Sequence, residues 1–165
     1  MRVHVLGSGA GGGFPQWNCH CTYCAGVRAG TLRTKPRTQS SITVSADGER
    51  WVLINASPDI RAQIASFAPL RPGRAVRDTG IAAVLLVDAQ IDHATGLLML
   101  REGPRLALYT TAAVHQDLST GFPVIPMLEH YCGVDWHPVA PDGTPFEMAE
   151  APGLRFHAFA LSSKA

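Results

Sequence analysis

Charged residues are scarce in this chain, and several other features are missing. Asp, Glu, Lys and Arg make up 16% of the 165 residues, the net charge is +1, and only Lys35 and Lys164 are lysines. This composition excludes a disordered charged tail, and nothing marks a nucleic-acid surface. No apolar run approaches the roughly 20 residues that a membrane-spanning helix needs. Residues 1–6 lead into a glycine loop without a signal-peptide h-region, so we expect no membrane insertion and a cytoplasmic, reducing environment.

Apolar residues, at 46% of the chain, provide enough material for one packed domain. The 16 glycines and 12 prolines predict many turns. Along the sequence, several predicted strands come first, and further strands then alternate with predicted helices. This order favours a mixed sheet with helices against it, in an α/β or layered α+β fold.

The periodicity of apolar residues predicts the individual elements. Strands are expected at residues 2–6, 38–45, 50–54, 81–87, 105–109 and 154–161, with weaker signals at 135–139 and 146–149. Helices are expected at residues 58–67, 94–101 and 111–118, and Asp47-Gly48 is typical of a hairpin turn. Because no capping helix follows in residues 162–165, we expect the chain to be part of a larger fold.

The glycine loop matches a nucleotide-binding pattern only in part. Residues 7–12 read G-x-G-x-x-G after a strand, which alone suggests a dinucleotide-binding turn. Such a site also needs a helix directly after the loop and an acidic residue about 20 positions further on. No amphipathic helix is predicted at residues 13–17, and no Asp or Glu precedes Asp47. We therefore interpret the loop as a close backbone crossing, or as a row of N–H groups that bind an anionic substrate group.

Three cysteines in one short segment indicate a metal site. Cys19, Cys21 and Cys24 form C-x-C-x-x-C, and clustered thiolates in a reducing environment favour structural zinc. A fourth ligand must come from elsewhere: the candidates are His20, His4, Cys132 or a residue beyond Ala165. The alternatives are three unligated buried cysteines, or a redox pair formed by Cys21 and Cys24.

A second cluster of ligand-type side chains follows the apolar strand at residues 81–87. It comprises Asp88, Gln90, Asp92 and His93. Strand ends are where α/β folds place their chemistry, and an adjacent Asp-His pair can face one metal ion. The alternative for this pair is a helix cap and a solvated histidine. We predict Asp92 and His93 as catalytic metal ligands, with Asp88 and Gln90 supporting them or contacting substrate.

The same segment resembles the H-x-H-x-D-H metal motif of the metallo-β-lactamase superfamily. Asp88 and Gln90 stand in place of its first two histidines. This departure argues against a two-metal hydrolase, because the resemblance leaves only Asp92 and His93 as metal ligands. With one more histidine, they would form the two-histidine, one-carboxylate set that suits non-haem Fe(II). The resemblance implies an αββα sandwich, of which residues 1–165 are the N-terminal part of a single domain.

Further segments resemble the PqqB family of pyrroloquinoline quinone (PQQ) biosynthesis proteins. The most specific are Phe-Pro-Gln-Trp-Asn-Cys at residues 14–19 and Asn-Ala-Ser-Pro-Asp at residues 55–59; others lie at residues 38–41, 90–93 and 96–103. The resemblance implies a cytoplasmic protein of the PQQ pathway. Its partners would be a precursor derived from a Glu- and Tyr-containing peptide and other proteins of the pathway.

Three functions remain open from the sequence. The first is an iron-dependent oxygenase that hydroxylates the tyrosine-derived ring, with Fe²⁺ at Asp92 and His93 and Zn²⁺ at the cysteines. The second is a soluble carrier that moves PQQ or its precursor towards the periplasm, and the third is a metallohydrolase. The third iron ligand is expected beyond Ala165, with His157 as an in-chain candidate, so we expect residues 1–165 alone to be inactive. Arg61 and Arg101 could neutralise substrate carboxylates or form surface salt bridges, and His115, His130 and His137 carry no clear signal.

Overall fold

A computed structural model describes residues 1–162 of the chain. Eight strands, five α-helices and two 3-10 helices (η) follow one another in these residues. Their bounds are β1 Arg2–Gly7, α1 Thr22–Arg28, β2 Ser41–Ser45, β3 Trp51–Ile54, α2 Ile60–Ser66, η1 Ala68–Leu70, β4 Ile81–Leu85, α3 Ile91–Ala94, η2 Thr95–Leu100, β5 Leu106–Thr110, α4 Ala112–Ser119, α5 Val124–Leu128, β6 Val134–Pro138, β7 Asp142–Glu147 and β8 Arg155–Phe159.

The central sheet has six strands in the order β1-β2-β3-β4-β5-β6. The first two pairings are antiparallel, and the pairings from β3 to β6 are parallel. The hairpin predicted at Asp47-Gly48 joins β2 to β3, and the Asp47 carboxylate accepts the N–H groups of Glu49 and Arg50. Strands β1, β3, β4, β5 and β6 therefore run the same way, and the loops after them meet at one edge of the sheet.

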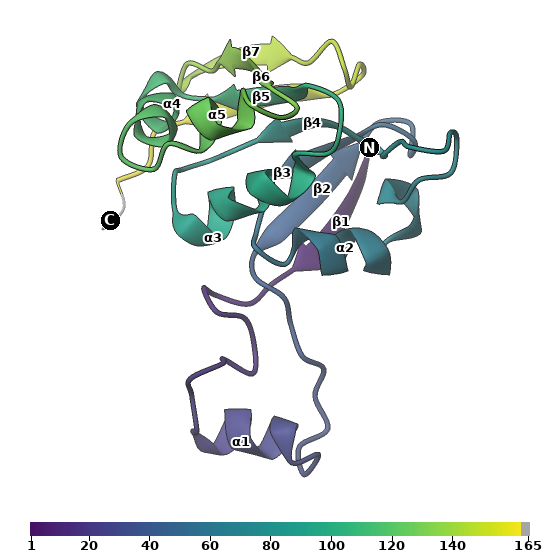
Figure 1. Cartoon of the computed structure of the whole chain (residues 1–165), viewed down its shortest axis with the longest axis vertical. Coiled ribbons are helices and arrows are strands. Elements are labelled where there is room, and N and C mark those ends of the chain that lie inside the picture. The colour runs from purple at the N-terminus through teal and green to yellow at the C-terminus, as the bar shows by residue number, and fades with distance from the viewer. Residues whose placement is uncertain (163–165) are drawn as a thin grey trace.

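Two apolar layers cover this sheet (Figure 1). On one face the helices pack through a cluster that includes Ile60, Leu97 and Leu118, all fully buried. On the other face the hairpin of β7 and β8 packs through a second cluster that includes Met148 and Leu154. The layering of helices, sheet and second sheet agrees with the predicted α/β class.

The second face is covered only over part of the sheet. Residues of β1 alternate in direction, so that His4 stacks on Phe67 while Val3 and Val5 point to the opposite face. Val3 is 54% exposed and Val5 is 58% exposed. Within residues 1–162, the apolar side chains of Val3 and Val5 on this face of β1 therefore stay largely uncovered.

Several predicted elements need correction. The helix expected at residues 94–101 is a short α3 followed by the 3-10 helix η2, because Gly96 donates its N–H to the Ala56 carbonyl and the chain tightens there. The helices α1 and α5 were not predicted. The strand expected at 146–149 begins at Asp142 and ends at Glu147. We expect no capping helix at residues 162–165; of these, residues 163–165 lie outside the described part of the chain.

Residues 8–40 form an extension that we call the arm. It leaves the body after β1, carries α1 at its tip and returns to β2 (Figure 1). Only two isolated bridges, Gly9 with Gln39 and Phe14 with Arg37, join its outgoing and returning segments as β-structure. None of the helices in residues 1–162 is long and apolar enough to cross a membrane.

Candidate metal centres

Polar loops gather at the edge where the parallel strands end. The glycine loop follows β1, residues 55–59 follow β3, and residues 88–93 follow β4. In an open α/β sheet this edge is the usual position of a binding site. The topology thus brings together three segments that lie far apart in the sequence.

His93 is held between two carboxylates at this edge. Its Nδ1 lies 2.8 Å from Oδ1 of Asp88, and its Nε2 lies 3.9 Å from Oδ2 of Asp92. The backbone N–H of Gln90 also donates to Oδ1 of Asp88, at 2.9 Å, and so fixes that carboxylate. A carboxylate on one ring nitrogen orients a metal-binding histidine. Nε2 of His93 and the Asp92 carboxylate are thereby directed to one place.

A tight crossing holds α3 against the end of β3. Asn55 has a left-handed backbone, with φ of 61°, and its side-chain oxygen accepts the N–H of Val87. The N–H of Ala56 donates to the His93 carbonyl at 2.7 Å. A Cβ atom on Gly96 would lie 2.2 Å from the Ser57 carbonyl oxygen, so only glycine fits there. The family resemblance includes residues 55–59 and 96–103, but the residue pattern alone assigned no role to Asn55 or Gly96.

The glycine loop lies against the same site. A Cβ atom on Gly11 would lie 3.4 Å from Oδ2 of Asp92. The N–H of Gly12 donates to the side-chain oxygen of Gln39 at 2.9 Å. The loop therefore lies within contact distance of Asp92, and its close backbone crossing is with residues 37–39, where a Cβ atom on Gly7 would lie 2.0 Å from the Gln39 carbonyl oxygen.

A buried polar network fixes Gln39 in turn. Its N–H and its side-chain amide both donate to Oδ2 of Asp59, at 2.9 and 3.1 Å. The amide of Gln63, which is 1% exposed, donates to the Gln39 carbonyl and to the Thr38 hydroxyl. Sequence reasoning missed Gln39 and Gln63, because no local pattern distinguishes a buried glutamine from a surface one.

The three cysteines of the arm lie together at the start of α1. The sulfur atoms of Cys19, Cys21 and Cys24 are all within 4.8 Å of one another. Arg28, in the last turn of the helix, reaches back and donates to the carbonyl oxygens of Gln16 and Cys19. A single short segment thus presents three thiol groups to one point, a donor set that fits zinc.

The thiols of Cys21 and Cys24 differ in acidity. The backbone N–H of Cys24 and the neighbouring thiols lower the pKa of Cys21 to about 7. A backbone hydrogen bond at Gln16 lowers the pKa of Cys24, but burial and the neighbouring Cys19 and Cys21 outweigh it and raise that pKa. The exposed thiol of Cys21 is therefore more acidic than the buried thiol of Cys24.

None of the candidate fourth ligands joins these cysteines within residues 1–162. His4 lies in β1, with its ring stacked on Phe67 at 3.8 Å. Cys132 packs beside the helix-side core, and burial raises its pKa. His20 is exposed within the cysteine segment.

The remaining predicted residues also lie away from Asp92 and His93. His157 lies on β8, where its Nδ1 is 3.0 Å from the Gly143 carbonyl oxygen. Arg101 pairs with Glu102 at 3.5 Å, and Arg61 is exposed on α2. Across the described residues, the cysteine trio is the only group of three or more potential ligands within mutual reach.

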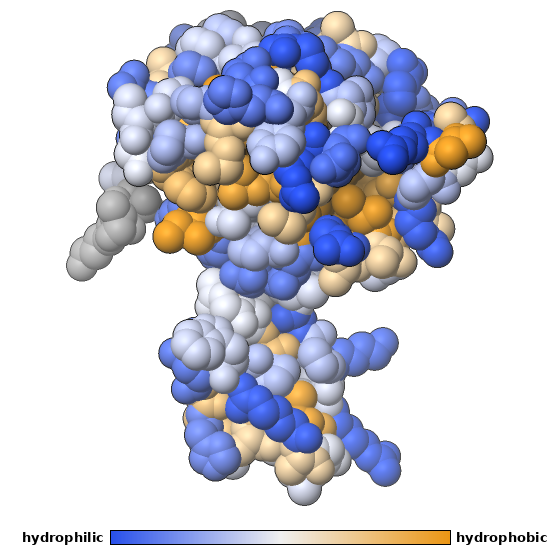
Figure 2. All heavy atoms as spheres, viewed as in Figure 1, coloured by the Kyte–Doolittle hydropathy of each residue, from blue (hydrophilic) through white to orange (hydrophobic). Residues whose placement is uncertain are grey.

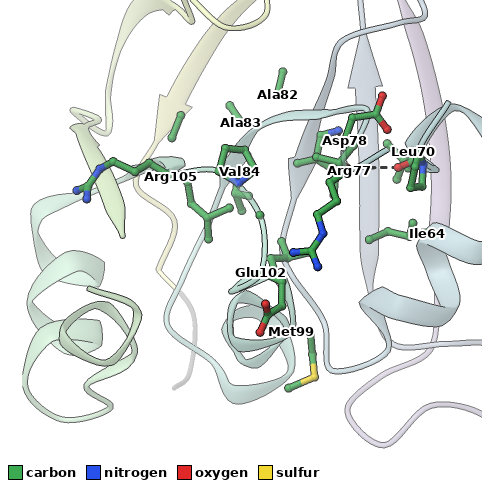
Figure 3. A pocket seen from close by; sticks show the side chains of 18 of the residues that line it. Ile64, Leu70, Arg77, Asp78, Ala82, Ala83, Val84, Met99, Glu102 and Arg105 are labelled. Atoms are coloured by element: carbon green, nitrogen blue, oxygen red, sulfur yellow. Dashed lines mark hydrogen bonds between the residues drawn. The ribbon is translucent and has the colours of Figure 1, made fainter. Parts of the chain in front are cut away.

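A large hollow lies at the opposite edge of the sheet, where β4 and β5 begin (Figure 3). Its volume is about 790 Å³. Leu70, Val84 and Met99 give it apolar walls, and the charged groups at its rim include Asp78, which pairs with Arg74. None of the predicted ligands lines it. The predicted ligands Asp92 and His93 therefore lie at the edge away from this hollow.

Comparisons with known proteins agree over the whole chain. The model of the beta-lactamase superfamily domain matches residues 50–165. Coenzyme PQQ synthesis protein B of Methylobacillus flagellatus is 61% identical over 100% of this chain and 55% of its own length. Coenzyme PQQ synthesis protein B of Pseudomonas aeruginosa (strain UCBPP-PA14) is 59% identical, again over 100% of this chain and 55% of its own length.

A solved structure is similar as well. The Zn²⁺-bound PqqB from Methylobacterium extorquens has a TM-score of 0.87 and 44% sequence identity. The match covers 98% of this chain and 56% of that one. The chain thus spans about half the length of the curated relatives it matches.

Proposed function

Because the chain belongs to the beta-lactamase superfamily and is similar along its whole length to coenzyme PQQ synthesis protein B, we propose that it acts in PQQ biosynthesis as part of an iron-dependent oxygenase. The observation that carries the proposal is the position of His93 between Asp88 and Asp92. One imidazole and one carboxylate directed to one place match two of the three ligands of a non-haem iron site.

Each residue of this centre has a separate task. Asp92 and His93 hold Fe²⁺ together with a third ligand from outside residues 1–162. Asp88 keeps Nδ1 of His93 occupied, so that Nε2 is the nitrogen available to the metal. When bound, Fe²⁺ supplies the capacity to activate O₂. The backbone of Gly11 and Gly12, held by Gln39, forms one wall of the site.

The cysteine trio has a structural task in this proposal. Zn²⁺ at Cys19, Cys21 and Cys24 ties the tip of the arm together, and the three-thiol donor set supports zinc rather than iron. The Zn²⁺ in the structure of the related PqqB is consistent with zinc binding in this family. The fourth ligand comes from His20 after a local change, or from outside the described residues.

The substrate in this proposal is a precursor derived from a Glu- and Tyr-containing peptide. The protein would act on it in the cytoplasm, together with other proteins of the pathway.

The residues at two positions of the metal motif, Asp88 and Gln90, oppose a two-metal hydrolase, since Asp88 is already engaged by His93. A soluble carrier role would require the cysteine zinc but no redox metal.

Metal analysis and one variant test the proposal. In a protein of the relatives' full length that carries these residues, we expect both iron and zinc to be bound. The variant His93→Ala should abolish O₂-dependent turnover and keep the cysteine zinc. Zinc alone would support the carrier, two or more zinc ions without iron would support the hydrolase, and full turnover of His93→Ala would overturn the iron assignment.

A further inference from the structure

The arm is the most one-sidedly charged part of the molecule. Between residues 8 and 40 it holds four basic residues and no acidic one, which gives a formal charge of +4 with neutral His20. The four are Arg28, Arg33, Lys35 and Arg37. Three thiolates around one Zn²⁺ would lower this charge by one, so the arm stays basic with its metal bound. The whole chain has a net charge of only +1, so the positive charge is concentrated here.

Ion pairs neutralise five of the nine basic residues of the body within residues 1–162 and none of the four in the arm. Five arginines of the body form ion pairs with carboxylates: Arg50, Arg74, Arg101, Arg105 and Arg155. Within residues 1–162, no basic residue of the arm has such a pair. Arg28 donates hydrogen bonds to two carbonyl oxygens within the arm, and Arg37 lies over the ring of Phe14 at 5.9 Å. Arg33 and Lys35 are exposed, which leaves two cations directed to the surroundings.

Aromatic side chains are exposed on the same arm. Trp17 is 81% exposed and Tyr23 is 70% exposed. Tyr23 lines a hollow of about 670 Å³ together with Leu32, Arg33 and the three cysteines of the trio, among others. Figure 2 shows hydrophilic side chains that project from the arm next to apolar surface. Exposed aromatic residues beside arginine are typical of protein–protein interfaces.

We propose that the arm is a docking surface for an acidic, aromatic-containing segment of a protein partner. Arg33 and Lys35 receive the carboxylates, and Trp17 and Tyr23 receive the apolar side chains. The arm projects from the rest of residues 1–162 (Figure 1). Only two outward cations are present, which is fewer than the phosphate contacts that nucleic-acid binding uses. The proposal is independent of the chemistry at Asp92 and His93.

Polymer binding to a zinc-loaded protein of the relatives' full length that carries these residues, at submicromolar concentration, tests the proposal. The probes are fluorescein-labelled poly-glutamate, a glutamate–tyrosine copolymer of equal charge, and a thymidine oligonucleotide, each followed by anisotropy. We expect binding that weakens with salt, with the copolymer bound most tightly. The variant R33E/K35E should bind the copolymer at least about ten-fold more weakly. The control R71E/R77E reverses two exposed body charges and should change binding less than about two-fold.

Each other outcome overturns the proposal in a defined way. Equal losses in the two double variants would mean that only the total charge matters. Tighter binding of the oligonucleotide would make the arm a nucleic-acid surface, and no binding of any polymer would remove the docking role. Loss of the copolymer's advantage in Trp17→Ser supports the aromatic contact, and its retention would reject that contact. Zinc content equal to that of the unmodified chain establishes that the R33E/K35E arm is folded.

Discussion

The two candidate metal centres of this chain are built in opposite ways. The cysteine trio draws its ligands from a segment of six residues at the tip of the arm, beside the start of α1. The centre at the sheet edge also has its predicted ligands in one segment, residues 88–93, but its supporting glutamines come from distant segments and are buried. Local sequence specifies the ligands of both centres, whereas the supports of the second exist only once the sheet has formed.

This difference indicates what each centre depends on. In the metal-free arm, short-range hydrogen bonds hold the three thiols together, among them those of Arg28 to the carbonyls of Gln16 and Cys19, so we expect a bound metal to stabilise the arm tip. At the sheet edge, the parallel strands and the network around Gln39 position Asp92 and His93 before any metal binds. The following predictions test this contrast, from the largest expected effect to the smallest.

Removal of one thiol should affect the arm alone. In Cys21→Ser we expect zinc affinity to fall at least about a hundred-fold and the melting temperature to drop, because structural zinc stabilises the fold that holds it. Zinc content by atomic emission and thermal unfolding are the measurements. Cys132→Ser is the control and should keep its zinc. Unchanged zinc content in Cys21→Ser would refute the zinc assignment.

Loss of the carboxylate behind His93 should affect the sheet edge alone. In a protein of the relatives' length, Asp88→Asn should weaken Fe²⁺ affinity about 10- to 100-fold, since such supporting partners orient the ligand. The cysteine zinc should remain. Anaerobic titration with Fe²⁺ measures the affinity, and Asp117→Asn, on the surface of α4, is the control. An unaltered affinity in Asp88→Asn would mean that Asp88 does not orient the ring.

A change in the buried network should show that the sheet edge is organised without metal. Gln63→Leu removes the amide that donates to the Gln39 carbonyl, so that this buried acceptor is left without its partner. We expect the free energy of unfolding to fall by about 1–3 kcal/mol, measured by urea denaturation of the metal-free chain. Gln116→Leu, at an exposed position of α4, should change it by less than about 0.5 kcal/mol. Equal effects of the two variants would argue against the network.

Thiol reactivity should distinguish the arm from the body without any mutation. Because the pKa of Cys21 is lowered to about 7 by the Cys24 backbone N–H and the neighbouring thiols, half of it is thiolate near that pH. Burial raises the pKa of Cys132, which therefore stays protonated. In the metal-free chain at neutral pH, iodoacetamide should modify Cys21 about ten-fold faster than Cys132. Mass spectrometry of each site over a pH series checks this, and matching pH profiles would contradict it.

The sign of the pH effect on the arm follows from the same lowered pKa. The folded metal-free arm favours the Cys21 thiolate, so this stabilisation is complete above the ordinary pKa of cysteine. It is lost as the pH falls towards and through 7. Zinc binding should weaken over the same range, because the proton competes with the metal for the thiolate.

The sequence by itself determined the local features. Alternating and continuous apolar runs gave β1 to β5, the turn at Asp47-Gly48 gave the β2–β3 hairpin, and the close spacing of Cys19, Cys21 and Cys24 gave the trio. The resemblance to the metallo-β-lactamase superfamily gave the fold, and the family match confirms it. These features depend on neighbouring residues, whose geometry is fixed by backbone periodicity and short loops.

Only the tertiary structure decided how distant residues meet. The parallel order of β3 and β4 brings residues 55–59 beside residues 88–93, and the tight contact at Gly96 shortens the predicted helix. The same packing lays Gly11 against Asp92, which is 81 residues away in sequence. It also places the buried amide of Gln63 under the glycine loop. These contacts depend on the path of the whole chain, because a side chain's partner across the sheet leaves no mark on the residues next to it in sequence.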